Sequence, residues 1–323
     1  MPPVLQVLLV TFPFFALVLA GYVAARRRML PLEAIPGLNG FVLFFALPCM
    51  LFRMGSTTPI AQLLDARVIA VYLLCGLLIV AFTIAISLNR RIRWNDASLG
   101  ALVAAFPNSG FMGVPLIVAL LGPVAGGTVI LTMVVDMVVT TSLCIALSRL
   151  DGAGGEGRAA VFAAGRKALR GVLTNPMPWA ITLGGVASAW AFRLPGPVEK
   201  TVWLLADAAS PVALFTIGAV LARAQMTANH PMPLSDYLPV SVIKLVVHPL
   251  LVLVVGLLAQ RLGLGLSETA LTVMVLTAAL PAASNVSLLA ERFGADNGRI
   301  ARIILVTTAA AFLTFSAAVT WLT

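Results

Sequence analysis

The longest charge-free stretch does most to constrain the fold of this chain. Between Asp96 and Asp136 there is no Asp, Glu, Lys or Arg. A bilayer core takes about 20 mostly apolar residues of helix, so this stretch is long enough for one span and part of another. The whole chain has the same character, since 60% of its 323 residues are hydrophobic and 10% are charged. Soluble domains carry about 25% charged residues. We therefore expect an all-α integral membrane protein.

The apolar segments predict ten transmembrane helices. Their expected ranges are 5–25, 34–54, 68–89, 97–121, 126–148, 173–192, 199–222, 238–260, 268–290 and 302–322. Residues 150–172 include the Gly-rich polar sequence DGAGGEGR, which is typical of a solvated linker. The expected organisation is thus a first five-helix repeat at 1–149, a cytoplasmic linker at 150–172, and a second five-helix repeat at 173–323.

The distribution of basic residues predicts the orientation. If the N-terminus lies outside, the inner loops hold about three times as many Lys and Arg residues as the outer loops, including the cluster Arg26–Arg28. We therefore expect a multi-pass protein of the cytoplasmic (inner) membrane with both termini outside. The three cysteines, Cys49, Cys75 and Cys144, lie in apolar segments, so no disulfide or zinc framework is expected.

The two halves of the chain share a spacing of prolines and glycines. Pro13, Gly21, Pro31 and Pro48 are followed, about 163 residues later in each case, by Pro176, Gly184, Pro195 and Pro211. Five spans is an odd number, so the second half would enter the membrane from the opposite side. Inverted repeats of this kind are common in secondary transporters.

Two corresponding spans contain helix-breaking sequences. FPNSGFMGVP at 106–115 interrupts span four, and LPAASN at 280–285 interrupts span nine. Proline opens a helix, and the freed peptide groups must then face protein or a wet cavity. One interpretation is a packing kink in each helix. The other is a polar substrate site at the membrane midplane, for which the candidates are Pro107, Asn108, Ser109, Gly110, Gly113, Pro281, Ser284 and Asn285.

Four ionisable side chains lie well inside predicted spans, where charge is costly and function is the default hypothesis. Asp136, Asp207 and His248 are candidates for proton or ion coupling. Asp207 is either a proton carrier or a structural partner for a nearby donor, and His248 is either a pH switch or a cap on a carbonyl freed by Pro249. We expect Lys244 to snorkel toward the cytoplasmic surface.

Several segments together resemble the auxin efflux carrier family, which includes bacterial malonate transporters and the plant PIN carriers. These segments are LNGFVLFFALPCMLF at 38–52, NSGFMGVPL at 108–116, ASPVALFTIGAVLA at 209–222 and PAASNVSLLAERFGAD at 281–296. The resemblance implies ten helices in two inverted repeats, with broken helices four and nine crossing at the site. It also implies a scaffold from spans 1, 2, 6 and 7, a transport domain from spans 3–5 and 8–10, and a homodimer.

The resemblance implies elevator-type transport of a small organic anion, such as malonate or malate. From the residues inside the spans, we expect this transport to be coupled to an ion gradient, with H⁺ or Na⁺ as the coupling ion. No other cofactor, metal or nucleic-acid partner is expected. The alternatives are a carrier or facilitator of an aromatic, auxin-like acid without ion coupling, or a channel. Because the sequence contains no HExxH or GxSxG motif and no Cys/His pair at metal-ligand spacing, we do not expect an enzyme.

Overall fold

The computed structural model describes residues 3–57, 65–149, 176–227 and 232–323. The predicted cytoplasmic linker, 150–172, lies outside these residues. Every regular element in the described part is helical, apart from one isolated antiparallel bridge between Pro107 and Ala282. The expectation of an all-helical membrane protein is confirmed in this respect.

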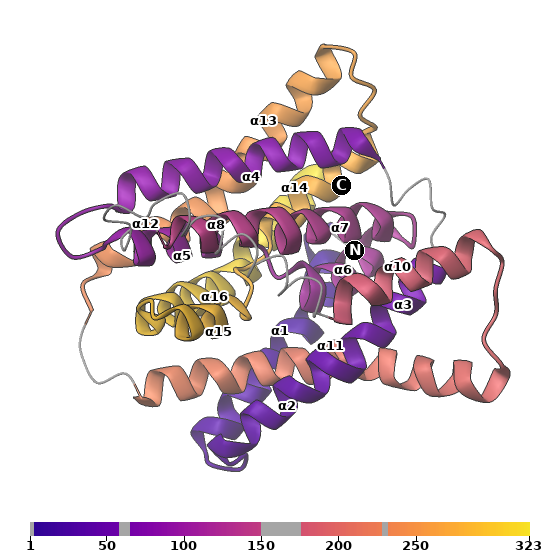
Figure 1. Ribbon diagram of the computed structural model, residues 1–323, viewed down its shortest axis with the longest axis horizontal. Coiled ribbons are helices and arrows are strands. Elements are labelled where there is room, and N and C mark those ends of the chain that lie inside the picture. Colours follow the sequence, from indigo (N-terminus) through magenta and orange to yellow (C-terminus); the bar gives the residue numbers. More distant parts are fainter. Residues whose placement is uncertain (1–2, 58–64, 150–175, 228–231) are drawn as a thin grey trace. The chain divides into compact units, whose positions relative to one another are not determined.

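Three π-helical turns interrupt the helices of the first half, which run from indigo to magenta in Figure 1. The elements are α1 (Pro3–Arg26), η1 (Leu32–Ala34), α2 (Ile35–Phe41), η2 (Val42–Ala46), α3 (Leu47–Thr57), α4 (Ala66–Ser87), α5 (Trp94–Ala105), η4 (Ser109–Gly113), α6 (Val114–Leu121), α7 (Ala125–Val135), η5 (Asp136–Thr140) and α8 (Thr141–Leu147). Turns η2, η4 and η5 are π-helical, a form that occurs frequently at functional sites.

The second half is built in the same way. Its elements are α10 (Pro176–Ala189), α11 (Gly196–Thr227), η7 (Leu234–Asp236), α12 (Leu238–Val242), η8 (Ile243–Val247), α13 (His248–Arg261), α14 (Glu268–Ala279), α15 (Val286–Phe293) and α16 (Asn297–Leu322). Turn η8 is π-helical and ends two residues before Pro249, which has no N–H group to donate within its helix.

Seven helical segments in the described part are long and apolar enough to cross a membrane. Three shorter apolar helices, Ser109–Leu121, Trp179–Ala189 and Glu268–Ala279, fall within the predicted spans four, six and nine. Spans four and nine are short here because their helices are broken, at 106–108 and at 280–285. The ten-helix inverted repeat stays a prediction.

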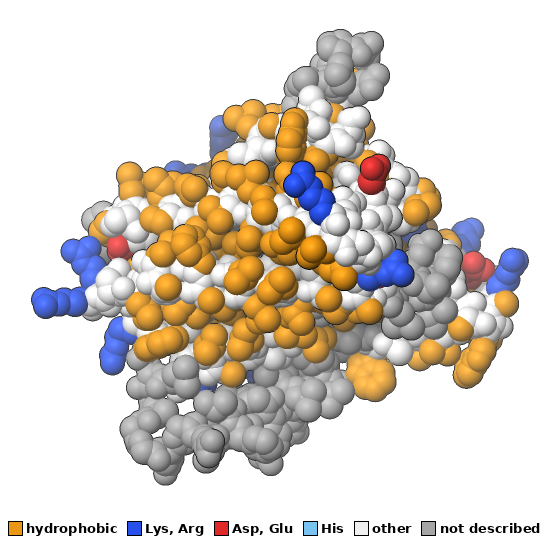
Figure 2. Space-filling view, turned by 90° about the horizontal axis from the view of Figure 1, so that it is seen from above, with side chains coloured by type: hydrophobic (Ala, Val, Ile, Leu, Met, Phe, Trp, Pro, Cys, Tyr) orange, Lys and Arg blue, Asp and Glu red, His pale blue; other side chains and the backbone are white. Residues whose placement is uncertain are grey.

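The described chain divides into two compact units. The first takes 1–65, 109–131 and 173–227, and the second takes 66–108, 132–172 and 228–323. The first unit therefore contains predicted spans 1, 2, 6 and 7, together with a segment that the resemblance assigned to the transport domain. Large hydrophobic side chains are exposed on helices of both units, and Figure 2 shows them predominating on one face. Such exposure is expected of helices that face lipid.

Close glycine contacts hold the first unit together. A Cβ atom built on Gly21 of α1 would lie 1.8 Å from the Phe215 carbonyl oxygen of α11, and one built on Gly218 would lie 1.8 Å from the Val18 carbonyl oxygen. Helices α3 and α10 meet in the same way, since a Cβ on Gly184 would lie 2.4 Å from the Phe52 carbonyl oxygen. Small residues let membrane helices pack backbone to backbone.

We expect Gly21→Ala to lower the free energy of unfolding by about 1–3 kcal/mol, because the added methyl must push α11 away. Gly40→Ala is the matched control, since a Cβ there meets nothing within 4 Å. Alanine is the better helix former by about 1 kcal/mol, so the control should be neutral or stabilising. Chemical unfolding of both purified variants in detergent measures the difference. Equal midpoints would contradict the close crossing.

Candidate functional site

The two helix breaks meet inside the second unit. Helix α5 ends at Ala105 and helix α14 at Ala279, and the residues that follow them, Phe106 and Leu280, are extended. The Asn108 N–H donates to the Pro281 carbonyl at 2.8 Å, and the Ala283 N–H donates to the Phe106 carbonyl at 3.0 Å. These two bonds form the antiparallel bridge between Pro107 and Ala282. The peptide groups of the two broken segments therefore hydrogen-bond to each other.

The bridge brings three predicted site residues together, namely Pro107, Asn108 and Pro281. Asn108 is only 4% exposed. Ser284 and Asn285 follow in the turn before α15, where both are half-buried. Asn285 is the N-cap residue of α15, but its side chain makes no capping bond. The first peptide N–H groups of α15 thus start close to the bridge along the chain.

The remaining candidates, Ser109, Gly110 and Gly113, form η4 in the first unit. Pro115 cannot donate a hydrogen bond, so it leaves the Phe111 carbonyl without its usual helical partner. Ser210 of α11 takes that place, because its Oγ donates to the Phe111 carbonyl at 3.3 Å. A side chain thus replaces the bond that proline removes.

In the second unit, the Lys244 side chain likewise donates to a carbonyl that has lost its helical partner. Its side chain is fully buried, so the expected snorkelling is wrong. Its Nζ donates to the Ala278 carbonyl at 2.6 Å. In an unbroken helix that carbonyl would accept from residue 282, but the Ala282 N–H instead donates to Thr307 Oγ1 at 3.3 Å. The ammonium therefore lies on a carbonyl that the break at Pro281 sets free.

Asp136 is also fully buried in the second unit and begins the π-helical turn η5. Its two carboxylate oxygens accept from the Tyr72 hydroxyl at 3.0 Å and from Thr140 Oγ1 at 3.1 Å. Asp136 and Lys244 also attract each other electrostatically. These two oppositely ionisable groups thus belong to one buried cluster.

His248 completes this cluster. Its Nδ1 lies 3.4 Å from Lys244 Nζ, and its ring centroid lies 6.1 Å from that of Tyr72. The ring is fully buried, and its Nε2 has no hydrogen-bond partner among the described residues. His248 therefore contacts the ammonium and caps no freed carbonyl through a described bond. Its role in ion coupling stays a prediction.

Asp207 belongs to the first unit. Its Oδ1 accepts from Arg53 Nη1 at 2.6 Å, and the Arg53 guanidinium lies 5.9 Å from the centroid of the Trp203 ring. The Asp207 side chain is 67% exposed and that of Arg53 is 28% exposed. This geometry fits the structural alternative better than a buried proton site.

Sequence reasoning did not identify Tyr72 and Thr307 as parts of the site. A hydroxyl is a weak signal in an apolar helix, because most such groups bond to their own backbone, as Thr277 does to the Val273 carbonyl at 2.7 Å. Among the described residues, no group of three or more His, Cys, Asp or Glu side chains could hold a metal ion.

The arrangement defines a class of protein: a polytopic helical membrane protein with two paired breaks and a buried charge cluster beside one of them. Residues 6–319 match the family model described as Membrane transport protein, so this chain belongs to that family of transporters.

Individual relatives agree with the family. A protein of Rhizobium meliloti (strain 1021) named "Putative malonate transporter" is 32% identical over 300 residues, which cover 92% of this chain and 89% of the relative. "Uncharacterized transporter YfdV" of Escherichia coli (strain K12) is 26% identical over 292 residues, covering 87% and 86%. A transporter of Methanothermobacter thermautotrophicus is 27% identical over 296 residues, covering 90% of each chain.

Proposed function

We propose that this chain is a secondary active transporter that moves a small mono- or dicarboxylate, such as malonate or malate, across the cytoplasmic membrane, driven by an ion gradient. The observation that carries the proposal is the pairing of two helix breaks through Asn108 and Pro281. Half-helix N-termini bind anionic groups, and opened carbonyls bind cations. A relative named for malonate transport supports a carboxylate in particular.

The proposed movement is elevator-type alternating access by a protein with two inverted five-helix repeats. Two features support the inverted repeats. The bridge is reciprocal, because each broken segment both donates to and accepts from the other. The glycine contacts of the first unit are reciprocal too: Gly21 and its repeat counterpart Gly184 each pack against the other half's helix, α11 and α3 respectively. A two-fold relation between the repeats would produce both patterns.

The proposal includes a homodimer with both termini outside the cytoplasmic membrane. The scaffold would come from spans 1, 2, 6 and 7, and the transport domain from spans 3–5 and 8–10. The first unit contains all four proposed scaffold spans, which supports this grouping. Segment 109–131 would then be the part of the transport domain that also packs on scaffold helices, as the bond from Ser210 to Phe111 illustrates.

Thermal unfolding of the purified protein against a panel of mono- and dicarboxylates tests the proposal. A ligand that binds only the folded state stabilises by about 2.7 kcal/mol at one hundred times its Kd, so malonate or malate should raise the melting temperature. Asn108→Ala should remove the shift because the buried amide no longer reaches the ligand. Asn39→Ala, a helical asparagine of the first unit, is the matched control and should keep it.

Two further outcomes distinguish the alternatives. A shift given by aromatic acids alone would favour an auxin-like substrate, and counterflow of labelled substrate in proteoliposomes marks a carrier rather than a channel. If Asn108→Ala binds and transports at the wild-type rate, the bridge is not the substrate site.

A further inference from the structure

At the C-terminal end of α14, the Lys244 side chain bonds to the Ala278 carbonyl. We infer that the Lys244 ammonium is a tethered cation which occupies the place of a bound inorganic cation at the opened end of α14, so that substrate binding and transport do not require Na⁺. The inference rests on the proposed function and names the cation dependence of that site.

Backbone geometry supplies the first argument. Leu280 N–H donates to the Thr277 carbonyl, Pro281 has no N–H group, and Ala282 N–H donates to Thr307. The Ala278 carbonyl is thereby left at the negative end of the α14 dipole without a peptide partner. Such an end attracts a cation, and in transporters with broken helices these carbonyls coordinate Na⁺ or H⁺. Lys244 Nζ occupies this position at 2.6 Å.

The second argument is the environment of the ammonium. Lys244 lies in the π-helical turn η8, whose extra residue per turn shifts the side chains that follow it. The titratable groups around the cluster are Tyr72 and Cys75 on α4, Asp136 on η5, Cys144 on α8 and His248 on α13. Asp136 is the one carboxylate among them. The residues around the ammonium thus supply a single carboxylate that can offset its charge, and an added Na⁺ would leave an excess positive charge in this interior.

Substrate binding measured in Na⁺ and in N-methyl-D-glucamine buffers tests the inference. Wild-type affinity for the carboxylate found above should agree within about twofold between the two buffers, since a tenfold change would need about 1.4 kcal/mol. Lys244→Ala should weaken binding about ten- to hundredfold, the usual effect of losing a buried charged hydrogen bond. Ethylammonium or Na⁺ should restore part of that affinity by filling the vacated space, whereas tetramethylammonium should not. Lys200→Ala, an exposed lysine of α11, is the control and should match the wild type.

Each result decides the question. Na⁺-dependent binding by the wild type overturns the inference, as does wild-type affinity in Lys244→Ala without any cation effect. If Lys244→Ala does not fold, Lys244→Gln keeps a donor for Ala278 but removes the charge. Weaker binding by Lys244→Gln supports the inference, and unchanged binding overturns it. If the wild type binds no carboxylate, the proposed function fails. The melting temperature of Lys244→Ala with and without ethylammonium then tests the tethered cation alone. A rise in melting temperature with ethylammonium supports the tethered cation, and no change overturns it.

Discussion

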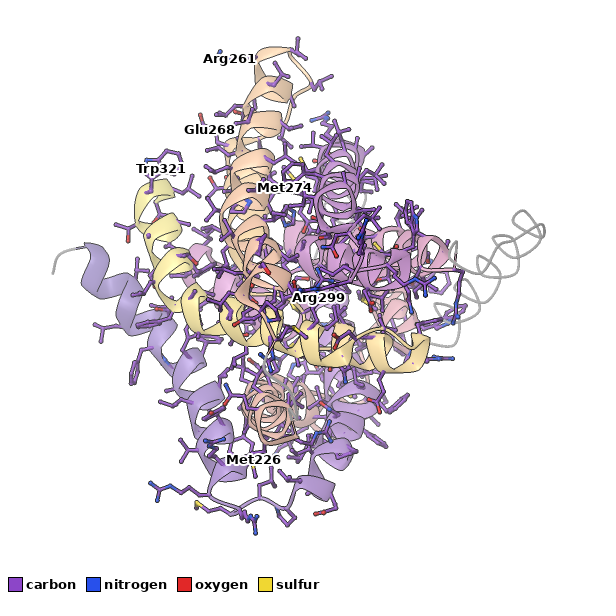
Figure 3. The ribbon with its side chains drawn as sticks, turned by 90° about the vertical axis from the view of Figure 1, so that its left-hand side faces the viewer. Met226, Arg261, Glu268, Met274, Arg299 and Trp321 are labelled. Carbon is purple, nitrogen blue, oxygen red and sulfur yellow. The ribbon has the colours of Figure 1, made fainter. Side chains whose placement is uncertain are left out.

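Replacing Arg299 with methionine should lower the free energy of unfolding by about 3–5 kcal/mol, because it breaks a buried network of charged hydrogen bonds. Arg299 is 2% exposed and lies in the first turn of α16, at the opposite end of that helix from Trp321 (Figure 3). Its Nε donates to the Asp236 carbonyl at 2.7 Å, and its Nη1 donates to the Asp96 carbonyl at 2.8 Å. One side chain thus joins the start of α5, the end of η7 and the start of α16.

The neighbours of Arg299 are arranged for a guanidinium. Asp296 Oδ1 accepts the Arg299 N–H at 3.0 Å, and Asp96 Oδ1 accepts the Asp296 N–H at 2.7 Å. A Cβ atom on Gly100 would lie 2.7 Å from Nη1, so glycine leaves the necessary room. Methionine fills a similar length but would leave two buried carbonyls without a donor.

Chemical unfolding of Arg299→Met in detergent measures the loss. Arg292→Met is the matched control, since Arg292 is exposed and only lies over the Phe293 ring at 6.0 Å. The control should change the free energy of unfolding by less than about 1 kcal/mol. Arg299→Lys should fall between the two, because lysine keeps the charge but cannot donate in two fixed directions. A loss no larger than that of the control would contradict the network.

The breaks in the helices could be predicted because proline acts locally. Pro107 and Pro281 remove peptide donors wherever they stand, so the ends of α5 and α14 follow from the sequence alone. The helical class followed from the charge-free segments in the same way. The partners of the freed groups depend on tertiary structure, however, and no local pattern connects Ala278 with Lys244 or Phe111 with Ser210.

Charged residues near predicted helix ends were the weakest part of the sequence reasoning. Lys244 lies a few residues inside its predicted span, and we expected it to reach the surface, while Arg299 lies between the last two predicted spans. Both are buried, at 0% and 2% exposure. Composition rules describe how an average lysine or arginine reduces its cost in a membrane. They do not apply where backbone carbonyls and a carboxylate already provide the countercharge.

In a double-mutant cycle on the free energy of unfolding, we expect Asp136 and Lys244 to show a large interaction energy. We expect either single variant, Asp136→Asn or Lys244→Met, to lower the free energy of unfolding by about 3–5 kcal/mol, because each leaves one buried charge uncompensated. The double variant should lose less than the sum of the two by about 1–3 kcal/mol, since it removes both charges together. Chemical unfolding of the wild type, the two single variants and the double variant measures this interaction energy.

A second double-mutant cycle, on an exposed ion pair, provides the comparison for this interaction energy. The exposed pair Asp207→Asn and Arg53→Met should give a coupling of at most about 1 kcal/mol, as expected of an ion pair near solvent. If the losses in free energy of unfolding from Asp136→Asn and Lys244→Met are strictly additive, the two charges do not interact. The ammonium on Ala278 would then need another counterion, and a substrate carboxylate would be the obvious one. A large coupling instead means that the cluster is neutral before any substrate arrives, as the tethered-cation inference requires.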